Sequence, residues 1–150
     1  MSRVEIPSDP QQLAEATVRS MYPRDHASQS LGIEVLEVAP GYARLAMTVR
    51  RDMLNGHAYC HGGFIFTLAD SAFAYACNSY NHNTVAAGCS IEYLAPGREG
   101  DRLTAEAVEQ TRVGRSGVYD VKVTNQQNQV VALFRGKSMR IKGEVIAGDT

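Results

Sequence analysis

The residues best suited to chemistry lie between positions 53 and 80, where a polar loop runs into a long apolar segment. Asp70 stands inside that segment, and its neighbours one helical turn away include no cation that could pair with it. Burying an unpaired carboxylate costs free energy, so an acid kept in such surroundings is a functional candidate. Asp70 could serve either as a general base that activates water or as a nucleophile.

Gly62 and Gly63 mark the point where the loop meets the apolar segment. The first N–H groups of a helix have no partner within it, the helix dipole is positive there, and glycine lets another atom approach the backbone. These properties suit a donor for the oxyanion that forms when a carbonyl carbon is attacked. A Gly-Gly pair before a helix equally often does no more than ease a turn.

The segment after Gly63 predicts a long central helix that is enclosed on most sides, because its apolar residues leave almost no polar stripe. Many of its residues are small, so a curved sheet could pack close to its backbone. Polar residues 78 to 83 predict the exit from this helix.

The remaining elements predict an α+β fold in which an antiparallel sheet wraps around the central helix. Ser8, Asp9 and Pro10 can cap and start a helix, which Pro23 ends. Two strands in 31–49 are joined by a turn at Ala39, Pro40 and Gly41. Four more strands are expected at 84–94, 103–112, 117–125 and 130–141. The predicted organisation is an N-terminal helical arm (1–30), one domain (31–142) and a tail (143–150). One sheet covers a single side of the helix, so we expect at least a dimer.

Composition narrows the class of protein. The 150 residues carry a net charge of -1, which argues against a general nucleic-acid or anionic-membrane surface. No apolar run approaches the roughly 20 residues of a membrane span, and the polar first residues do not resemble a signal peptide. Three cysteines without a CxxC pair suit free thiols, so we expect a cytoplasmic protein.

Several segments together resemble a known family. The loop NGHAYCHGG, the helix LADSAFAYACNS and the later segments IEYLAPGREGDRL, GVYDVKV and VALFRGKS are similar, in order and spacing, to hot-dog-fold acyl-CoA thioesterases of the phenylacetate-pathway (PaaI) type. The resemblance spans roughly residues 31 to 141. It implies hydrolysis of acyl-CoA thioesters such as phenylacetyl-CoA and hydroxyphenylacetyl-CoA without a cofactor. It also implies a homotetramer, built as a dimer of dimers, with each active site between two subunits.

The resemblance gives three residues a catalytic role: Asp70 as base or nucleophile, Gly62 as oxyanion donor and Asn55 as the amide that positions the thioester or the water. Without the resemblance, Asn55 and Gly56 would be read as an ordinary Asn-Gly turn. Asp70 follows Gly62 by eight residues, or about 12 Å of helix, so the two could hardly act on one carbonyl from a single chain. This spacing favours a site shared between chains.

Further side chains are candidates for holding the substrate. An apolar pocket for the acyl group is expected to be lined by Leu54, Phe64 and Tyr59, with His61 and Gly63 beside it at the helix start. Ser71 and Thr67 are weaker candidates, as hydroxyls near Asp70 that could hold water. Those expected near the CoA phosphates are Arg112, Arg115, Lys137 and Arg140. Capping or loop packing explains His61 slightly better than a substrate contact, core packing explains Phe64 equally well, and each basic residue taken alone fits a solvated surface charge.

Other functions could also explain the residues between positions 53 and 80. His57, Cys60 and His61 could suggest a metal site, but a structural zinc needs four ligands and no fourth is near, so no metal is expected. Cys60 beside a helix start could be a nucleophile of lowered pKa, which would leave Asp70 without a role. Hydratases of this fold usually use a histidine on the central helix, and none is present here. A non-catalytic acyl-CoA-binding module is the remaining alternative, and an intact Asp70 argues against it.

Overall fold

Six antiparallel strands form one sheet in the computed structural model, which describes residues 5–147. The strands are β1 (Glu34–Ala39), β2 (Tyr42–Thr48), β3 (His82–Tyr93), β4 (Arg102–Val113), β5 (Ser116–Thr124) and β6 (Val130–Glu144). Their order across the sheet is β1-β2-β4-β5-β6-β3, so β1 and β3 are the two edges. The predicted strands are all present.

Two strand ends extend at least two residues beyond the sequence-based expectation. β3 begins at His82, inside the polar cluster that was expected to be only a helix exit, and β6 continues three residues past Ile141. The two extensions pair with each other, since His82 lies opposite Glu144 in the ladder. Polar residues have a weak preference for strands, but pairing between β3 and β6 overrides it. This pairing cannot be predicted from either segment alone.

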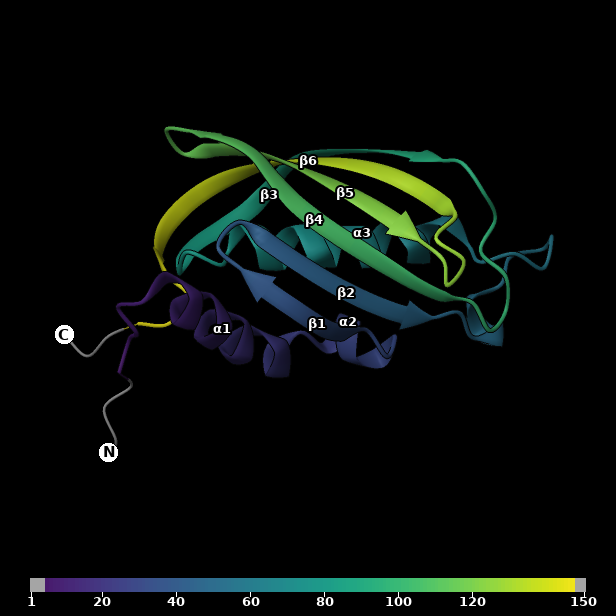
Figure 1. Cartoon of the computed structure of the whole chain (residues 1–150), viewed down its shortest axis with the longest axis horizontal. Coiled ribbons are helices and arrows are strands. Elements are labelled where there is room, and N and C mark those ends of the chain that lie inside the picture. The colour runs from purple at the N-terminus through teal and green to yellow at the C-terminus, as the bar shows by residue number, and fades with distance from the viewer. Residues whose placement is uncertain (1–4, 148–150) are drawn as a thin grey trace.

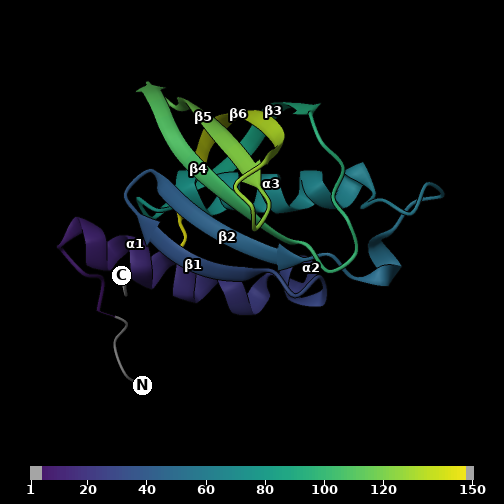
Figure 2. The same cartoon turned by 45° about the vertical axis from the view of Figure 1, so that its right-hand side comes forward.

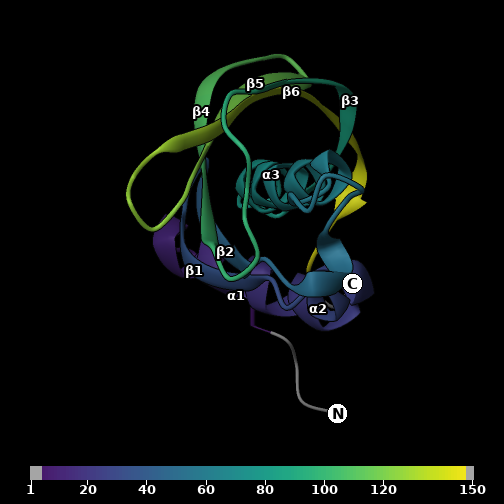
Figure 3. The same cartoon turned by 90° about the vertical axis from the view of Figure 1, so that its right-hand side faces the viewer.

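The long helix α3 (Gly62–Cys77) lies inside the curve of the sheet, which confirms the predicted hot-dog fold (Figures 1 and 3). One face of α3 is fully buried and packs against β2, β4 and β5. The helix lies tightly against the sheet at Gly136 of β6, where an added Cβ would lie 2.9 Å from the ring of Phe73. A glycine at this position therefore lets the helix sit close to the sheet.

The N-terminal residues form two helices, of which α1 packs beside β1 and α2 contacts α3 (Figure 2). α1 (Pro10–Met21) begins as predicted, with the Asp9 side chain accepting a hydrogen bond from the backbone N–H of Gln12. A short 3₁₀ turn (Tyr22–Arg24) follows, and then α2 (His26–Ser30), which lies beyond the helix that was expected to end before Pro23. A helix of five residues is too short to show apolar periodicity. Its signal is the N-cap Asp25, which accepts from the backbone and hydroxyl of Ser28.

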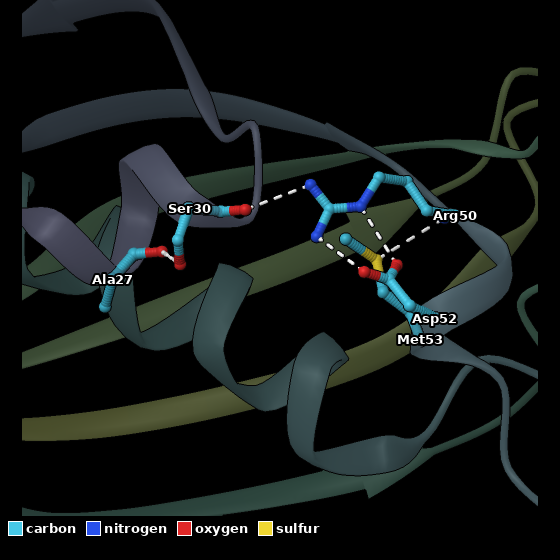
Figure 4. Close-up of polar contacts among 5 residues, drawn as sticks. All are labelled: Ala27, Ser30, Arg50, Asp52 and Met53. Carbon is cyan, nitrogen blue, oxygen red and sulfur yellow. Dashed lines mark hydrogen bonds and ion pairs between the residues drawn. The ribbon is translucent and has the colours of Figure 1, made fainter.

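The connection from β2 to α3 is held by Arg50 (Figure 4). Its guanidinium donates to the carbonyl oxygen of Ser30 at the end of α2 and to the carboxylate of Asp52. These contacts precede a 3₁₀ turn (Arg51–Met53), and they join the start of the loop to the helical arm. The position of the loop therefore depends on residues distant in sequence.

The two edges of the sheet are not equivalent. β1 is accompanied by α1, whose Gln11 side chain donates to the carbonyl oxygen of Val38. β3 pairs with β6 along one side, and no other strand of residues 5–147 pairs with its other side. Residues 85–90 of β3 are all exposed.

No helix in the described part of the chain is both long and apolar enough to cross a bilayer.

Candidate active site

The loop before α3 is closed by its own hydrogen bonds, and Asn55 is their centre. The Asn55 Oδ1 atom accepts from the backbone N–H groups of His57 (2.9 Å) and Tyr59 (3.2 Å), while the Asn55 backbone N–H donates to the Tyr59 carbonyl. Leu54 and Cys60 form an isolated antiparallel bridge at the base of the loop. Asn55 thus builds the turn, and its amide nitrogen donates to no group among residues 5–147, so it is available to a ligand.

His61 caps α3 and leaves one backbone donor open. Its Nδ1 atom accepts from the N–H of Gly63 at 3.0 Å, and its carbonyl accepts from Phe64. The N–H of Gly62, the first residue of the helix, meets no acceptor within residues 5–147. An unpaired N–H at a helix start is the donor that an oxyanion needs. Of the two glycines, Gly62 rather than Gly63 therefore offers a free N–H.

A cavity of about 430 Å³ lies over this donor and includes both Asn55 and Gly62 in its lining. Its opposite wall comes from the end of β3 and the following segment, which reach the same end of the molecule as the loop (Figure 1). Tyr93 lies against Gly62: its hydroxyl donates to the Gly62 carbonyl at 2.9 Å, and a Cβ on Gly62 would come within 3.0 Å of its ring. Sequence reasoning did not select Tyr93, because an aromatic residue at a strand end is common in sheets.

Asp70 lies on α3, half-buried, and it has no cation beside it. Burial is the sole cause that raises the pKa of its carboxyl above the ordinary aspartate value, and no described residue forms a hydrogen bond or ion pair with it. The negative charge of Asp70 contributes to the raised pKa values of Cys77 and Cys89, which places the three side chains in one neighbourhood. A desolvated carboxylate without a partner has the character of a general base or a nucleophile.

The structure does not bring Asp70 and Gly62 of one chain to the same point. Both lie on the continuous helix α3, and eight residues of helix correspond to about 12 Å. The cavity over Gly62 accordingly has no contribution from Asp70. The free N–H of Gly62 and the carboxylate of Asp70 therefore lie apart within one chain.

The side chains expected near the acyl group differ in their packing and in their hydrogen-bond partners. Leu54 and Phe64 are half-buried against the core, and the Phe64 ring lies edge-on to His61 with 6.0 Å between ring centroids. The Ser71 hydroxyl oxygen lies 3.3 Å from that of Ser28 on α2 and donates to it, because the single hydroxyl hydrogen of Ser28 is donated to Asp25. Thr67 donates to the carbonyl of Gly63. The two hydroxyls thus already have protein partners.

Cys60 does not have the properties of a nucleophile. Its side chain is 5% exposed, and burial raises the pKa of its thiol to about 11. Reactive cysteines need a thiolate, which a helix start or a nearby cation normally favours. Here desolvation dominates over the helix start. Among residues 5–147, no three His, Cys, Asp or Glu side chains gather in a group that could hold a metal ion.

Three of the four basic candidates share one cavity of about 440 Å³ at the other end of α3. Arg112, Arg115 and Arg140 line it, whereas Lys137 is exposed on β6 and does not. His82 also lines this cavity, although it was not singled out in the sequence. The polar residues around it indicated only a helix exit.

Comparison with known proteins agrees with this architecture. Residues 57–132 match the family model described as the thioesterase superfamily. The chain is 50% identical over 126 residues to the acyl-coenzyme A thioesterase PaaI of Escherichia coli, covering 84% of this chain and 90% of that protein.

Solved structures show the same relationship. The structure of E. coli PaaI, from the phenylacetic acid degradation operon, superposes with a TM-score of 0.89 at 47% identity and covers 91% of this chain and 99% of that one. A Streptococcus mutans protein bound to acetyl-CoA superposes with a TM-score of 0.71 at 29% identity, covering 75% of this chain and 90% of the other. The chain therefore belongs to the thioesterase superfamily, as a thioester hydrolase built on the hot-dog fold.

Proposed function

We propose that this enzyme hydrolyses acyl-CoA thioesters, with phenylacetyl-CoA and hydroxyphenylacetyl-CoA as preferred substrates, in the degradation of phenylacetate. The observation that carries the proposal is the unpaired, half-buried carboxylate of Asp70, whose pKa is raised by burial. The relationship to PaaI of E. coli supports the acyl-CoA substrate and the pathway. The aromatic acyl group rests on that relationship alone.

In the proposed reaction, the N–H of Gly62 holds the thioester oxygen while Asp70 acts at the carbonyl carbon. As a general base, Asp70 takes a proton from water as the water oxygen attacks. The tetrahedral oxyanion then collapses, the carbon–sulfur bond breaks, and protonated Asp70 returns the proton to the departing CoA sulfur. As a nucleophile, Asp70 would instead attack the carbonyl carbon and expel CoA as its thiolate, which gives a mixed anhydride. Water then hydrolyses the anhydride to the free acid and the Asp70 carboxylate, and the proton released goes to the CoA thiolate. The free amide nitrogen of Asn55 would orient the thioester or the water.

The N–H of Gly62 and the carboxylate of Asp70 would meet across a dimer. A second chain pairing along the free edge of β3 would extend the sheet and place its own α3 beside the first, so that Asp70 of one subunit faces Gly62 of the partner subunit. The open edge of β3 supports this arrangement, because an unpaired edge strand favours pairing with another chain. A homotetramer, as a dimer of such dimers, is the assembly we propose.

Substrate contacts follow from the same arrangement. Leu54 and Phe64, with His61 and Gly63, would face the acyl group near the loop, and Ser71 would lie beside Asp70. The basic residues Arg112, Arg115, Lys137 and Arg140 are the candidates for the CoA phosphates. Because Cys60, Cys77 and Cys89 are free thiols, we place the enzyme in the reducing cytoplasm.

Release of CoA, followed with a thiol reagent, tests the proposal. The substrates would be phenylacetyl-CoA, hydroxylated phenylacetyl-CoAs and straight-chain acyl-CoAs, each with wild type and Asp70→Asn. We expect aryl substrates to be hydrolysed fastest and kcat to fall by about 10²-fold or more in the variant, with its fold and oligomeric state intact. Binding of CoA without hydrolysis of any thioester would instead indicate an acyl-CoA-binding module.

A further inference from the structure

Two hydroxyl groups flank Asp70 on α3, and both have already donated their hydrogens. Thr67, one turn before Asp70, donates to the carbonyl oxygen of Gly63 at 2.9 Å. Ser71, the next residue, donates to the hydroxyl oxygen of Ser28 on α2. A hydroxyl group has one hydrogen and two acceptor lone pairs, so these two oxygens can accept further bonds but cannot donate them. Together with the Asp70 carboxylate, they form a group of hydrogen-bond acceptors on the partly exposed side of α3.

A buried network on α2 fixes the direction of the Ser71 hydrogen. Ser28 is fully buried, and its hydroxyl donates to the carboxylate of Asp25 at 2.6 Å. That carboxylate also accepts the backbone N–H of Ser28 and the hydroxyl of Tyr75. Burial alone would raise the pKa of Asp25, but these hydrogen bonds outweigh burial and lower it, so Asp25 is ionised at neutral pH. Because the hydrogen of Ser28 is held by this charge, Ser28 presents only its oxygen to Ser71.

The chain of hydrogen bonds from Asp25 to Ser71 also strengthens Ser71 as an acceptor. Hydrogen bonds in a chain polarise one another, and here the chain starts at a negative charge. Its last bond is the longest, with 3.3 Å between the oxygens of Ser28 and Ser71, whereas hydroxyl pairs usually lie about 2.5–3.0 Å apart. Hydrogen bonds that serve catalysis are often long before substrate binds and shorten in its complex. A ligand that lies between Ser71 and Asp70 must therefore supply a hydrogen to each.

We propose that Ser28 is a positioning residue, which holds the Ser71 hydroxyl so that Ser71 and Asp70 together orient the attacking water. The inference rests on the proposed function, with Asp70 as general base. The water donates one hydrogen to each residue, and its oxygen then faces the thioester carbonyl with a free lone pair. As the oxygen attacks, the proton on the Asp70 side passes to the carboxylate, while the hydrogen bonded to Ser71 stays on that oxygen and leaves with the acid. Without Ser28, the Ser71 hydrogen would be free to bond to the water oxygen and occupy the lone pair that attacks.

Two variants separate positioning from simple packing. Ser28→Ala removes the oxygen that holds the Ser71 hydrogen, and we expect kcat for phenylacetyl-CoA to fall roughly tenfold with KM near wild type, because the water is misplaced while substrate binding is not affected. Tyr75→Phe is the matched control, since it removes another hydroxyl bond between α3 and Asp25 and leaves the contact between Ser28 and Ser71 in place. Its kcat should stay near wild type. Equal losses of kcat in the two variants would make Ser28 a tether between the helices and overturn the proposal.

A double variant tests whether Ser28 acts through Ser71. We expect Ser28→Ala/Ser71→Ala to have the same kcat as Ser71→Ala alone, whereas multiplied losses of kcat would refute the proposal. Ser28→Ala keeps the backbone bond to Asp25, so α2 should fold, and Ser28→Cys, a weak acceptor of similar size, should repeat its effect. If wild type hydrolyses no thioester, the proposed function fails and this inference fails with it. If Asp70→Asn is inactive but Ser28→Ala retains wild-type kcat, only the role of Ser28 is refuted.

Discussion

At the scale of single residues, the environment of Asp70 leads to a prediction of how the enzyme should respond to pH. Burial raises the pKa of this carboxyl, and no hydrogen bond or cation in the described part of the chain opposes the effect. Asp120 on β5 is the opposite case, because hydrogen bonds from Arg135 hold the pKa of its carboxyl below the ordinary value. The two acids should therefore affect activity and stability in different ways.

For activity, we expect the acidic limb of the pH profile of kcat/KM to lie above pH 3.8, the ordinary aspartate pKa, since Asp70 must be ionised to act. Asp120→Asn should leave this limb in place, because Asp120 lies on the exposed side of the sheet, paired with Arg135. An acidic limb at or below pH 3.8 in wild type would contradict the assignment of Asp70 as the base.

For stability, the folded state holds the Asp70 proton more tightly than the unfolded state does. Wild type therefore loses free energy of unfolding as pH rises from the unfolded pKa through the raised folded pKa. Asp70→Asn removes this loss, so the variant should equal or exceed the stability of wild type at neutral pH. Asp120→Asn should have the opposite sign and lose stability that is present above the unfolded pKa. Urea unfolding across pH 3 to 8 measures the free energy of unfolding of both variants and of wild type. If Asp70→Asn is less stable than wild type at neutral pH, the Asp70 carboxylate is not unpaired in the folded protein.

Gly62 permits a test of the backbone N–H itself. It is the first residue of α3, where proline is tolerated, so Gly62→Pro removes the N–H without breaking the helix. Gly62→Ala keeps the N–H and introduces a similar clash with Tyr93, which makes it the matched control. We expect kcat for Gly62→Pro to be roughly 10²–10³-fold below that of Gly62→Ala, the usual cost of losing one oxyanion donor. Equal kcat values for the two variants would remove Gly62 from the oxyanion site.

At the scale of elements, α3 is positioned by three kinds of contact. Its N-terminus follows a loop that Arg50 ties to α2, and its middle packs on the sheet at Gly136. Towards its C-terminal end, the Tyr75 hydroxyl donates to Asp25, the cap of α2. Burial alone would raise the pKa of Asp25, but hydrogen bonds from Ser28 and Tyr75 outweigh it and lower that pKa. The small helix α2 thus fixes α3 from the side that the sheet does not cover.

The contact at Gly136 should be sensitive to one added methyl group. Gly136→Ala would place a Cβ 2.9 Å from the Phe73 ring, and both elements would have to move apart. We expect a loss of about 1–3 kcal/mol in the free energy of unfolding, the typical cost of overpacking. The control is Gly56→Ala, where an added Cβ meets nothing within 4 Å. Chemical denaturation of both variants is the measurement, and equal stability would show that the sheet can yield at this point.

At the scale of the whole molecule, the separation of Asp70 from Gly62 leads us to propose that catalysis depends on assembly. The proposed dimer predicts complementation between two inactive variants. A chain with Asp70→Asn keeps a working Gly62, and a chain with Gly62→Pro keeps a working Asp70, so a mixed dimer has one intact site. After subunit exchange of an equal mixture, we expect roughly a quarter of wild-type activity, because half of the dimers are mixed and each has one intact site of two.

The control for complementation is each variant exchanged with itself, which should stay inactive. Sedimentation must show that both variants form the wild-type assembly. If mixed samples that have exchanged subunits remain inactive, each site lies within one chain, and the shared-site arrangement is wrong.

Most of the helices and strands, and the candidate residues, could be predicted from the sequence, because both depend on local chemistry. The apolar run after Gly63 could only be an enclosed helix, the turns at Gly41 and after Asn125 delimited strands, and Asp70 stood out as a charge in apolar surroundings. Short or polar segments were less informative. Helix α2 was missed, since five residues show no periodicity, and the start of β3 at His82 depends on pairing with β6.

The contacts between these residues could be seen only in the folded chain. It showed that His61 occupies the N–H of Gly63 and leaves that of Gly62 free, that Tyr93 covers Gly62, and that burial makes Cys60 unreactive. It also joined Arg112, Arg115 and Arg140 around one cavity and left Lys137 outside. The physical reason is that hydrogen-bond partners, desolvation and the grouping of charges depend on distances between segments far apart in the chain, whereas helix and strand preferences depend on neighbours along it.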